Sequence, residues 1–166
     1  MPADVLRLIE PPPAGCAQTS ERARFKISDP LKAMKAIGEV TTQMLQAFAD
    51  AWNRHDVDAL MSFMTDDCVF EASAGPEVCG ARFEGPEAVR AAFAEVWATF
   101  PDAHWGNARH FVCGDRGVSE WIFTGTRGDG TRVEVHGCDL FRFRDGRISL
   151  KNSYRKNRPP LSRPSS

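Results

Sequence analysis

The sequence has no apolar run that approaches the ~20 residues needed to span a membrane, and its formal net charge is only −1. A chain so close to neutral gives no indication of a nucleic-acid or membrane-surface partner. The first residues, MPADVLRLIEPPPAG, lack both a lysine-rich start and a continuous apolar stretch. We therefore expect no signal peptide and no membrane span.

Cysteine and histidine also lack the spacing that metal or disulfide frameworks require. The five cysteines include no C-x-x-C pair, and the four histidines are scattered. This pattern predicts no metal site. We expect reduced thiols that mostly pack in the core of a cytoplasmic protein. The cysteines are Cys16, Cys68, Cys79, Cys113 and Cys138.

The length of 166 residues suits one domain with a real core. We expect a loosely ordered arm over residues 1–37, a folded domain over 38–156, and a basic, proline-rich tail over 157–166. Apolar residues at helical spacing predict a first helix from Val40 to Trp52. Asp56 is a suitable N-cap for a short second helix, and Pro86 and Pro101 bracket a third.

The rest of the chain reads as strands joined by short turns. A short strand is expected at 68–72 and another at 81–84. Four longer strands are expected at about 103–113, 117–127, 132–144 and 147–156. Helices followed by an antiparallel sheet predict an α+β domain.

The turns predict which strand residues face one another. Asp129-Gly130 and Asp145-Gly146 suit two-residue type I′ loops. With these loops, Asp139 faces Glu120 on one side and Asn152 on the other, and a loop centred on Asp115-Arg116 completes the row. The two predicted rows are Phe111, Glu120, Asp139, Asn152 and Arg109, Ile122, Gly137, Tyr154.

This register predicts a small-molecule site. Val118, Phe141 and Leu150 face one another in a row beside these two, and Gly137, which has no side chain, leaves a hollow between Ile122 and Tyr154. An apolar hollow with a few converging polar groups is the usual form of such a site. Two carboxylates ~5 Å apart do not ionise together easily. One can then donate a hydrogen bond while the other acts as a base.

Other interpretations stay open for these residues. A three-residue loop or a bulge would move Glu120 to the other face. Arg109 could pair with a carboxylate and make it structural, and Asn152 and Tyr154 could simply satisfy neighbours. The same register places Trp121 on the opposite face, where burial against a second subunit is expected. The predicted row there is His110, Trp121, Cys138, Ser153, with Leu140 beside it.

Several segments resemble the NTF2-like superfamily, in particular its SnoaL-like polyketide cyclase and ketosteroid isomerase branch. They are WNRHDVDALMSFMTDDCVFEA, FEGPEAVRAAF, FPDAHW, EWIFTGT and CDLFRFRDGRI. The resemblance implies an NTF2-like cone, in which a curved sheet packs against three helices around a pocket, and usually a homodimer. It also implies that Asp139 is the strand aspartate of these families. The isomerase tyrosine falls at Phe48, and its general-base aspartate falls at or near Ala72.

We therefore expect cofactor-free acid/base chemistry on a small, largely apolar, oxygenated molecule. The candidate reactions are isomerisation, aldol-type cyclisation, dehydration (a lyase reaction) and epoxide opening. Asp139 is the expected acid or base and Glu120 its partner, while Arg109, Asn152 and Tyr154 orient the substrate. The expected walls are Phe111, Val118, Phe141, Leu150, Phe48 and Trp52. The competing hypothesis is a non-catalytic ligand-binding or dimerisation module, in which Asp139 is fully paired.

Overall fold

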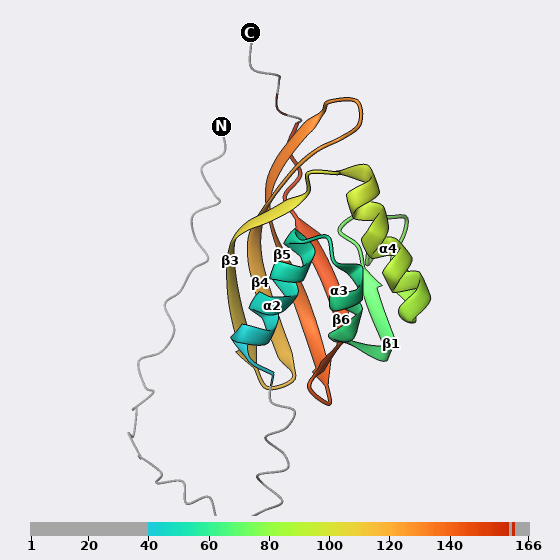
Figure 1. Cartoon of the computed structure of the whole chain (residues 1–166), viewed down its shortest axis with the longest axis vertical. Coiled ribbons are helices and arrows are strands. Elements are labelled where there is room, and N and C mark those ends of the chain that lie inside the picture. Colours follow the sequence, from blue (N-terminus) through green and yellow to red (C-terminus); the bar gives the residue numbers. More distant parts are fainter. Residues whose placement is uncertain (1–39, 160, 162–166) are drawn as a thin grey trace, which may run out of the picture.

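The computed structural model describes residues 40–159 and 161 (Figure 1). The expected arm over residues 1–37 lies outside the described residues, as does most of the expected tail. Within the described part, three helices lie on one side of a curved six-stranded sheet. This arrangement confirms the predicted α+β, NTF2-like cone. No helix among the described residues is long and apolar enough to cross a membrane.

The helices begin and end where local capping chemistry dictates. α2 spans Thr42–Asn53, and the hydroxyl of Thr41 accepts a hydrogen bond from the amide of Met44 at 3.3 Å. α3 spans Val57–Ser62, and the predicted cap, Asp56, accepts from the amide of Ala59 at 2.9 Å. α4 spans Pro86–Thr99 and carries proline in its first turn, where no amide is needed. The three predicted helices are confirmed.

The strands follow the predicted order, but the sheet is mixed. Its strand order is β2-β1-β6-β5-β4-β3, and β1 runs parallel to β6 while the other neighbours are antiparallel. The first strand begins at Met64, earlier than the predicted residue 68. The strands are β1 Met64–Glu71, β2 Arg82–Glu84, β3 His104–Cys113, β4 Arg116–Thr126, β5 Arg132–Arg144 and β6 Arg147–Arg155.

The loop between β4 and β5 is one residue longer than the predicted two-residue turn. The amide of Arg127 donates to the carbonyl of Thr131 at 2.9 Å, so residues 128–130 form the turn. Ser119 therefore lies opposite Asp139, and Glu120 lies opposite Cys138. Because side chains alternate along a strand, the one-residue shift puts Glu120 on the other face from Asp139. The predicted Glu120–Asp139 pairing is wrong.

A bulge in β6 shifts the second register. Arg144 pairs with Arg147 and Phe143 with Ile148, as predicted, but the next pair is Arg142 with Leu150. Ser149 is the extra residue, and its hydroxyl donates to the carbonyl of Arg142 at 3.2 Å. Beyond this bulge Asp139 faces Ser153 and Phe141 faces Lys151. The prediction that Asn152 faces Asp139 and Leu150 faces Phe141 is therefore wrong.

The register of β3 against β4 also differs, although without a change of face. Arg109 lies opposite Glu120, and Phe111 lies opposite Val118. The predicted neighbours, Glu120 for Phe111 and Ile122 for Arg109, are each two residues away. A shift of two keeps side chains on the same face.

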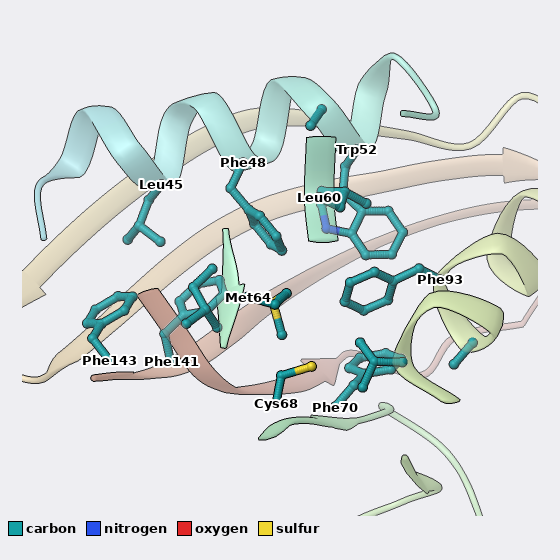
Figure 2. Packing of buried hydrophobic residues seen from close by; sticks show 14 residues of the cluster. Leu45, Phe48, Trp52, Leu60, Met64, Cys68, Phe70, Phe93, Phe141 and Phe143 are labelled. Atoms are coloured by element: carbon teal, nitrogen blue, oxygen red, sulfur yellow. The ribbon is translucent and has the colours of Figure 1, made fainter. Parts of the chain in front are cut away.

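The main core lies between α2 and the sheet face that carries Asp139. Figure 2 shows Leu45, Phe48 and Trp52 pointing from α2 toward the sheet. Phe48 packs edge-to-face on Phe141 with ring centroids 5.9 Å apart, and Trp52 packs on Phe93 of α4 at 4.7 Å. Each buried aromatic contributes about 1.5–3 kcal/mol. This packing fixes α2 and α4 over the concave face of the sheet.

Candidate functional site

A buried ion pair lies at the centre of the concave face. The ammonium of Lys151 on β6 is 2.7 Å from Oδ1 of Asp139 on β5, and the two side chains are only 6% and 8% exposed. Oδ1 also accepts from the hydroxyl of Ser153 at 2.6 Å, and Oδ2 accepts from the indole of Trp121 at 3.0 Å. Asp139 therefore has three protein donors around its carboxylate.

Lys151 is held from several sides. Its Nζ lies 2.6 Å from Oγ of Ser153, and it also lies over the rings of Phe70 and Trp52, 4.9 and 5.4 Å from their centroids. Buried charges need such partners because the loss of hydration is costly. An ammonium has three N–H donors, and Asp139 and Ser153 occupy two within the described part of the chain. The third N–H has no hydrogen-bond acceptor among the described residues.

Gly137 permits the contact between Trp121 and Asp139. Trp121 on β4 and Gly137 on β5 are cross-strand partners, and a Cβ on Gly137 would lie 2.2 Å from the Trp121 ring. The indole thus occupies the space over Gly137 and directs its Nε1 to the carboxylate. The hollow predicted at Gly137, between Ile122 and Tyr154, is filled on the concave face by this ring.

An aromatic cavity of about 590 Å³ lies beside Lys151, between α4 and the sheet, and residues of β1 and β2 contribute to its wall. Three side chains of β6 reach its wall: Lys151, Ser153 and Arg155. Asp139 does not line this cavity but a separate small void of about 20 Å³ behind it, with Phe48 and Phe141. Of the two members of the ion pair, Lys151 alone lines this cavity. The apolar wall includes Trp52, Phe70, Phe83, Val96, Phe100, Trp105, Trp121 and Phe123.

His110 borders the void that contains Asp139. Its Nδ1 lies 2.8 Å from Oγ of Ser119, and its Nε2 lies 3.2 Å from Oε1 of Gln46. Burial lowers the pKa of His110 below its ordinary value, although the nearby carboxylate of Asp50 acts in the opposite direction. The predicted convex position of His110 is wrong, because β3 places it on the concave face.

The residues predicted for the site are divided between the two faces of the sheet. Phe48, Trp52 and Phe141 lie with Asp139 on the concave side. The others lie on the convex side, where the side chain of Asn152 donates to the hydroxyl of Tyr154 at 3.2 Å. The predicted convex residues Trp121 and Ser153, in contrast, contact Asp139. The convex group consists of Glu120, Arg109, Asn152, Tyr154, Phe111, Val118 and Leu150.

Lys151 was missed by the sequence analysis. The available signal was the position of Lys151 in an apolar strand, three residues after Ile148. A two-residue turn followed by a β6 without a bulge, however, predicts that its side chain lies on the convex face. Only the extra residue at Ser149 brings it beside Phe141. Among residues 40–159 and 161, no group of three or more His, Cys, Asp or Glu side chains is arranged to hold a metal ion.

Comparisons with known proteins agree with this fold. Residues 45–150 match the family model described as SnoaL-like domain. An NTF2-like protein of unknown function from Mesorhizobium loti is 31% identical, with 70% of this chain and 90% of that chain covered and a TM-score of 0.58. No curated protein matches the chain.

Two further solved structures are similar at 23% identity, which indicates the fold alone. One is a candidate polyketide cyclase from Xanthomonas campestris pv. campestris, with a TM-score of 0.61 over 68% of this chain and 87% of that chain. The other is a hypothetical protein with a ketosteroid isomerase-like fold from Catenulispora acidiphila, solved with trimethylamine. Its TM-score is 0.61 over 69% of this chain and 86% of that chain.

Proposed function

Because the chain belongs to the SnoaL-like domain family, we propose that it is an enzyme that performs cofactor-free acid/base chemistry on a small, apolar, oxygenated substrate. The observation that carries this proposal is the Lys151 ammonium, which is buried against Asp139 and lines an aromatic cavity of about 590 Å³. The candidate reactions are isomerisation, aldol-type cyclisation, dehydration and epoxide opening. Each of them develops negative charge on an oxygen.

Lys151 is the group that stabilises this charge. Its remaining N–H donates to the carbonyl or epoxide oxygen of the substrate as negative charge develops there. The aromatic wall limits hydration, so the interaction is stronger than in water. Removal of one such donor typically lowers kcat by about 10²–10³. Before the reaction begins, Asp139 holds the ammonium and balances its charge.

Ser153 extends the polar centre into the cavity. Its hydroxyl donates to Asp139 at 2.6 Å and accepts from Lys151 at 2.6 Å, and it lines the cavity beside the ammonium. A hydroxyl that both donates and accepts can pass a proton between a substrate and a carboxylate. Ser153 therefore connects Asp139 to the cavity for the transfer of a proton.

A second candidate function is a non-catalytic ligand-binding module. The observation that favours it is the extensive pairing of Asp139, which accepts from three protein donors. A carboxylate with this environment is satisfied without any substrate. In this case Lys151 binds a ligand oxygen but no bond changes.

One experiment separates the two functions. Purified protein is incubated with ketones, lactones and epoxides of the size of the cavity, and turnover and binding are measured for wild type, Lys151→Arg and Lys151→Met. An enzyme loses turnover by about 100-fold or more in Lys151→Met. Lys156→Met changes an exposed lysine just beyond the end of β6 and should keep turnover. Binding without turnover in wild type across the panel would favour the module.

We also propose a homodimer that forms through the convex face of the sheet. Three large side chains there are well exposed: Phe111 at 57%, Leu140 at 41% and Tyr154 at 52%. Adjacent exposed apolar side chains mark interaction surfaces. A cytoplasmic location belongs to the same proposal and is supported by the free thiols of Cys68, Cys79, Cys113 and Cys138.

A further inference from the structure

Arg155 is a second cation in the cavity beside Lys151. It follows Lys151 by four residues on β6, and its side chain lines the same cavity. Lys151 is neutralised by Asp139, whereas none of the ion pairs found among the described residues includes Arg155. Glu95 on α4 is the carboxylate that lines this cavity, and it is exposed and forms no ion pair in the described part of the chain.

Arg127 brings further positive charge to the same end of the cavity. Its guanidinium lies 5.4 Å from the ring centroid of Phe100, which is itself part of the cavity wall. Arg127 lines an adjoining void of about 210 Å³, and Arg155 lines both this void and the cavity. The void is also bordered by Lys156, Arg158 and Glu134. Burial lowers the pKa of Arg155, and the charge of Arg127 lowers it further. The two guanidinium groups therefore interact unfavourably with each other.

We propose that the ligand of the cavity is an amphipathic organic anion, whose carboxylate binds Arg155 and Arg127 while an oxygen at its other end reaches Lys151. A guanidinium matches a carboxylate through two parallel N–H bonds. The apolar body of the ligand lies among the tryptophan and phenylalanine rings between the two ends. This inference rests on the proposed function of Lys151, and it adds the substrate class.

The spacing along β6 sets the length of this ligand. Residues four apart on a strand have Cα atoms ~13 Å apart and side chains on the same face. The carboxylate and the reacting oxygen therefore belong to opposite ends of an elongated molecule. An aromatic keto acid has this distribution of groups, whereas a compact neutral ketone leaves the arginines without a partner.

Matched acid and amide pairs test the proposal by isothermal titration calorimetry on the full chain. The probes are 2-naphthoate with 2-naphthamide and 4-phenylbutanoate with 4-phenylbutanamide, which differ in charge but hardly in size. Wild type is expected to bind an acid at least tenfold more tightly than its amide, which corresponds to 1.4 kcal/mol. Arg155→Gln is expected to abolish most of this preference, because binding of the acid weakens far more than binding of the amide.

Arg116→Gln is the matched control. It removes the same guanidinium charge at an exposed position of β4, and Arg116 lines neither the cavity nor the adjoining void, so the preference for the acid should persist. Ala92→Trp, which adds bulk to the cavity wall on α4, should weaken binding of all four probes and so places them in the cavity.

The outcomes distinguish this inference from the proposed function. Equal affinity of wild type for acid and amide would overturn the anion proposal and leave the cavity as a ligand site. A preference that survives Arg155→Gln but disappears in Lys151→Met would place the carboxylate at Lys151 and would also overturn it. Failure of every probe to bind would count against both proposals. Inorganic phosphate is tested alone, and binding as tight as that of the acids would show that the apolar body plays no part.

Discussion

Lys151 and Asp139 form an ion pair across two adjacent strands, with Nζ and Oδ1 2.7 Å apart and both side chains more than nine-tenths buried. Transfer of either charge alone from water to this environment is costly. The pair thus explains why an aspartate occurs between apolar positions of β5. Each charge is tolerated because the other is present.

Removal of one partner should therefore destabilise the protein more than removal of both. We expect Lys151→Met to lower the free energy of unfolding by about 3–5 kcal/mol, because it leaves the Asp139 carboxylate buried without its cation. The double variant Lys151→Met with Asp139→Asn should recover part of this loss. Denaturant melts at pH 8 measure the effect, with Lys156→Met as the control. A single variant within 1 kcal/mol of wild type would show that the pair does not stabilise the fold.

Local sequence patterns were sufficient to predict the elements of the fold. The α2 stripe of Leu45, Phe48 and Trp52, the Asp56 cap and the Pro86 start are all features of nearby residues, so they can be read directly. The family resemblance then supplied the cone, which the turns alone do not specify.

The composition of the site depended on strand register, which sequence patterns determine less well. The residues Gly128, Asp129 and Gly130 are compatible with a two- or a three-residue loop, and a difference of one residue exchanges the two faces. The bulge at Ser149 has no turn residue to reveal it. Asp139 does lie on an apolar face, as expected, but its neighbour on β4 is Ser119 and not the predicted Glu120.

Gly137 should be intolerant of any side chain. We expect Gly137→Ala to destabilise the protein by about 1–3 kcal/mol, because the new Cβ would lie 2.2 Å from the Trp121 ring and must displace it. The displacement removes the indole donor from Asp139. Denaturant melts and the tryptophan emission spectrum measure the change. Gly128→Ala, where an added Cβ meets nothing within 4 Å, is the control, and an equal effect there would contradict this explanation.

The convex face should mediate self-association. We expect wild type to be a dimer by size-exclusion chromatography with light scattering, and Leu140→Asp to be mainly monomeric. The reason is that Leu140 is 41% exposed and forms one row across this face with Val118 and the exposed Phe111. Ala94→Asp introduces the same charge on an exposed position of α4 and should leave the dimer intact. A monomeric wild type, or a dimeric Leu140→Asp variant, would argue against this interface.

His110 should make stability depend on pH just below neutrality. Burial lowers the pKa of His110 in the folded protein relative to the ordinary value of about 6.5. Between the lowered value and 6.5, the unfolded chain binds more protons than the folded one, so the free energy of unfolding rises with pH. The contribution is complete above 6.5 and is lost as the pH falls through this interval.

Replacement of His110 should remove this part of the pH dependence. We expect urea melts between pH 5 and pH 8 to show a shallower rise in stability for His110→Asn than for wild type. His136→Asn, at an exposed position of β5, should keep the wild-type slope. The effect matters for the site because His110 borders the void that contains Asp139 and Lys151, so protonation adds a positive charge beside the ion pair. Equal slopes for wild type and His110→Asn would mean that the hydrogen bonds to Ser119 and Gln46 accommodate the proton without cost.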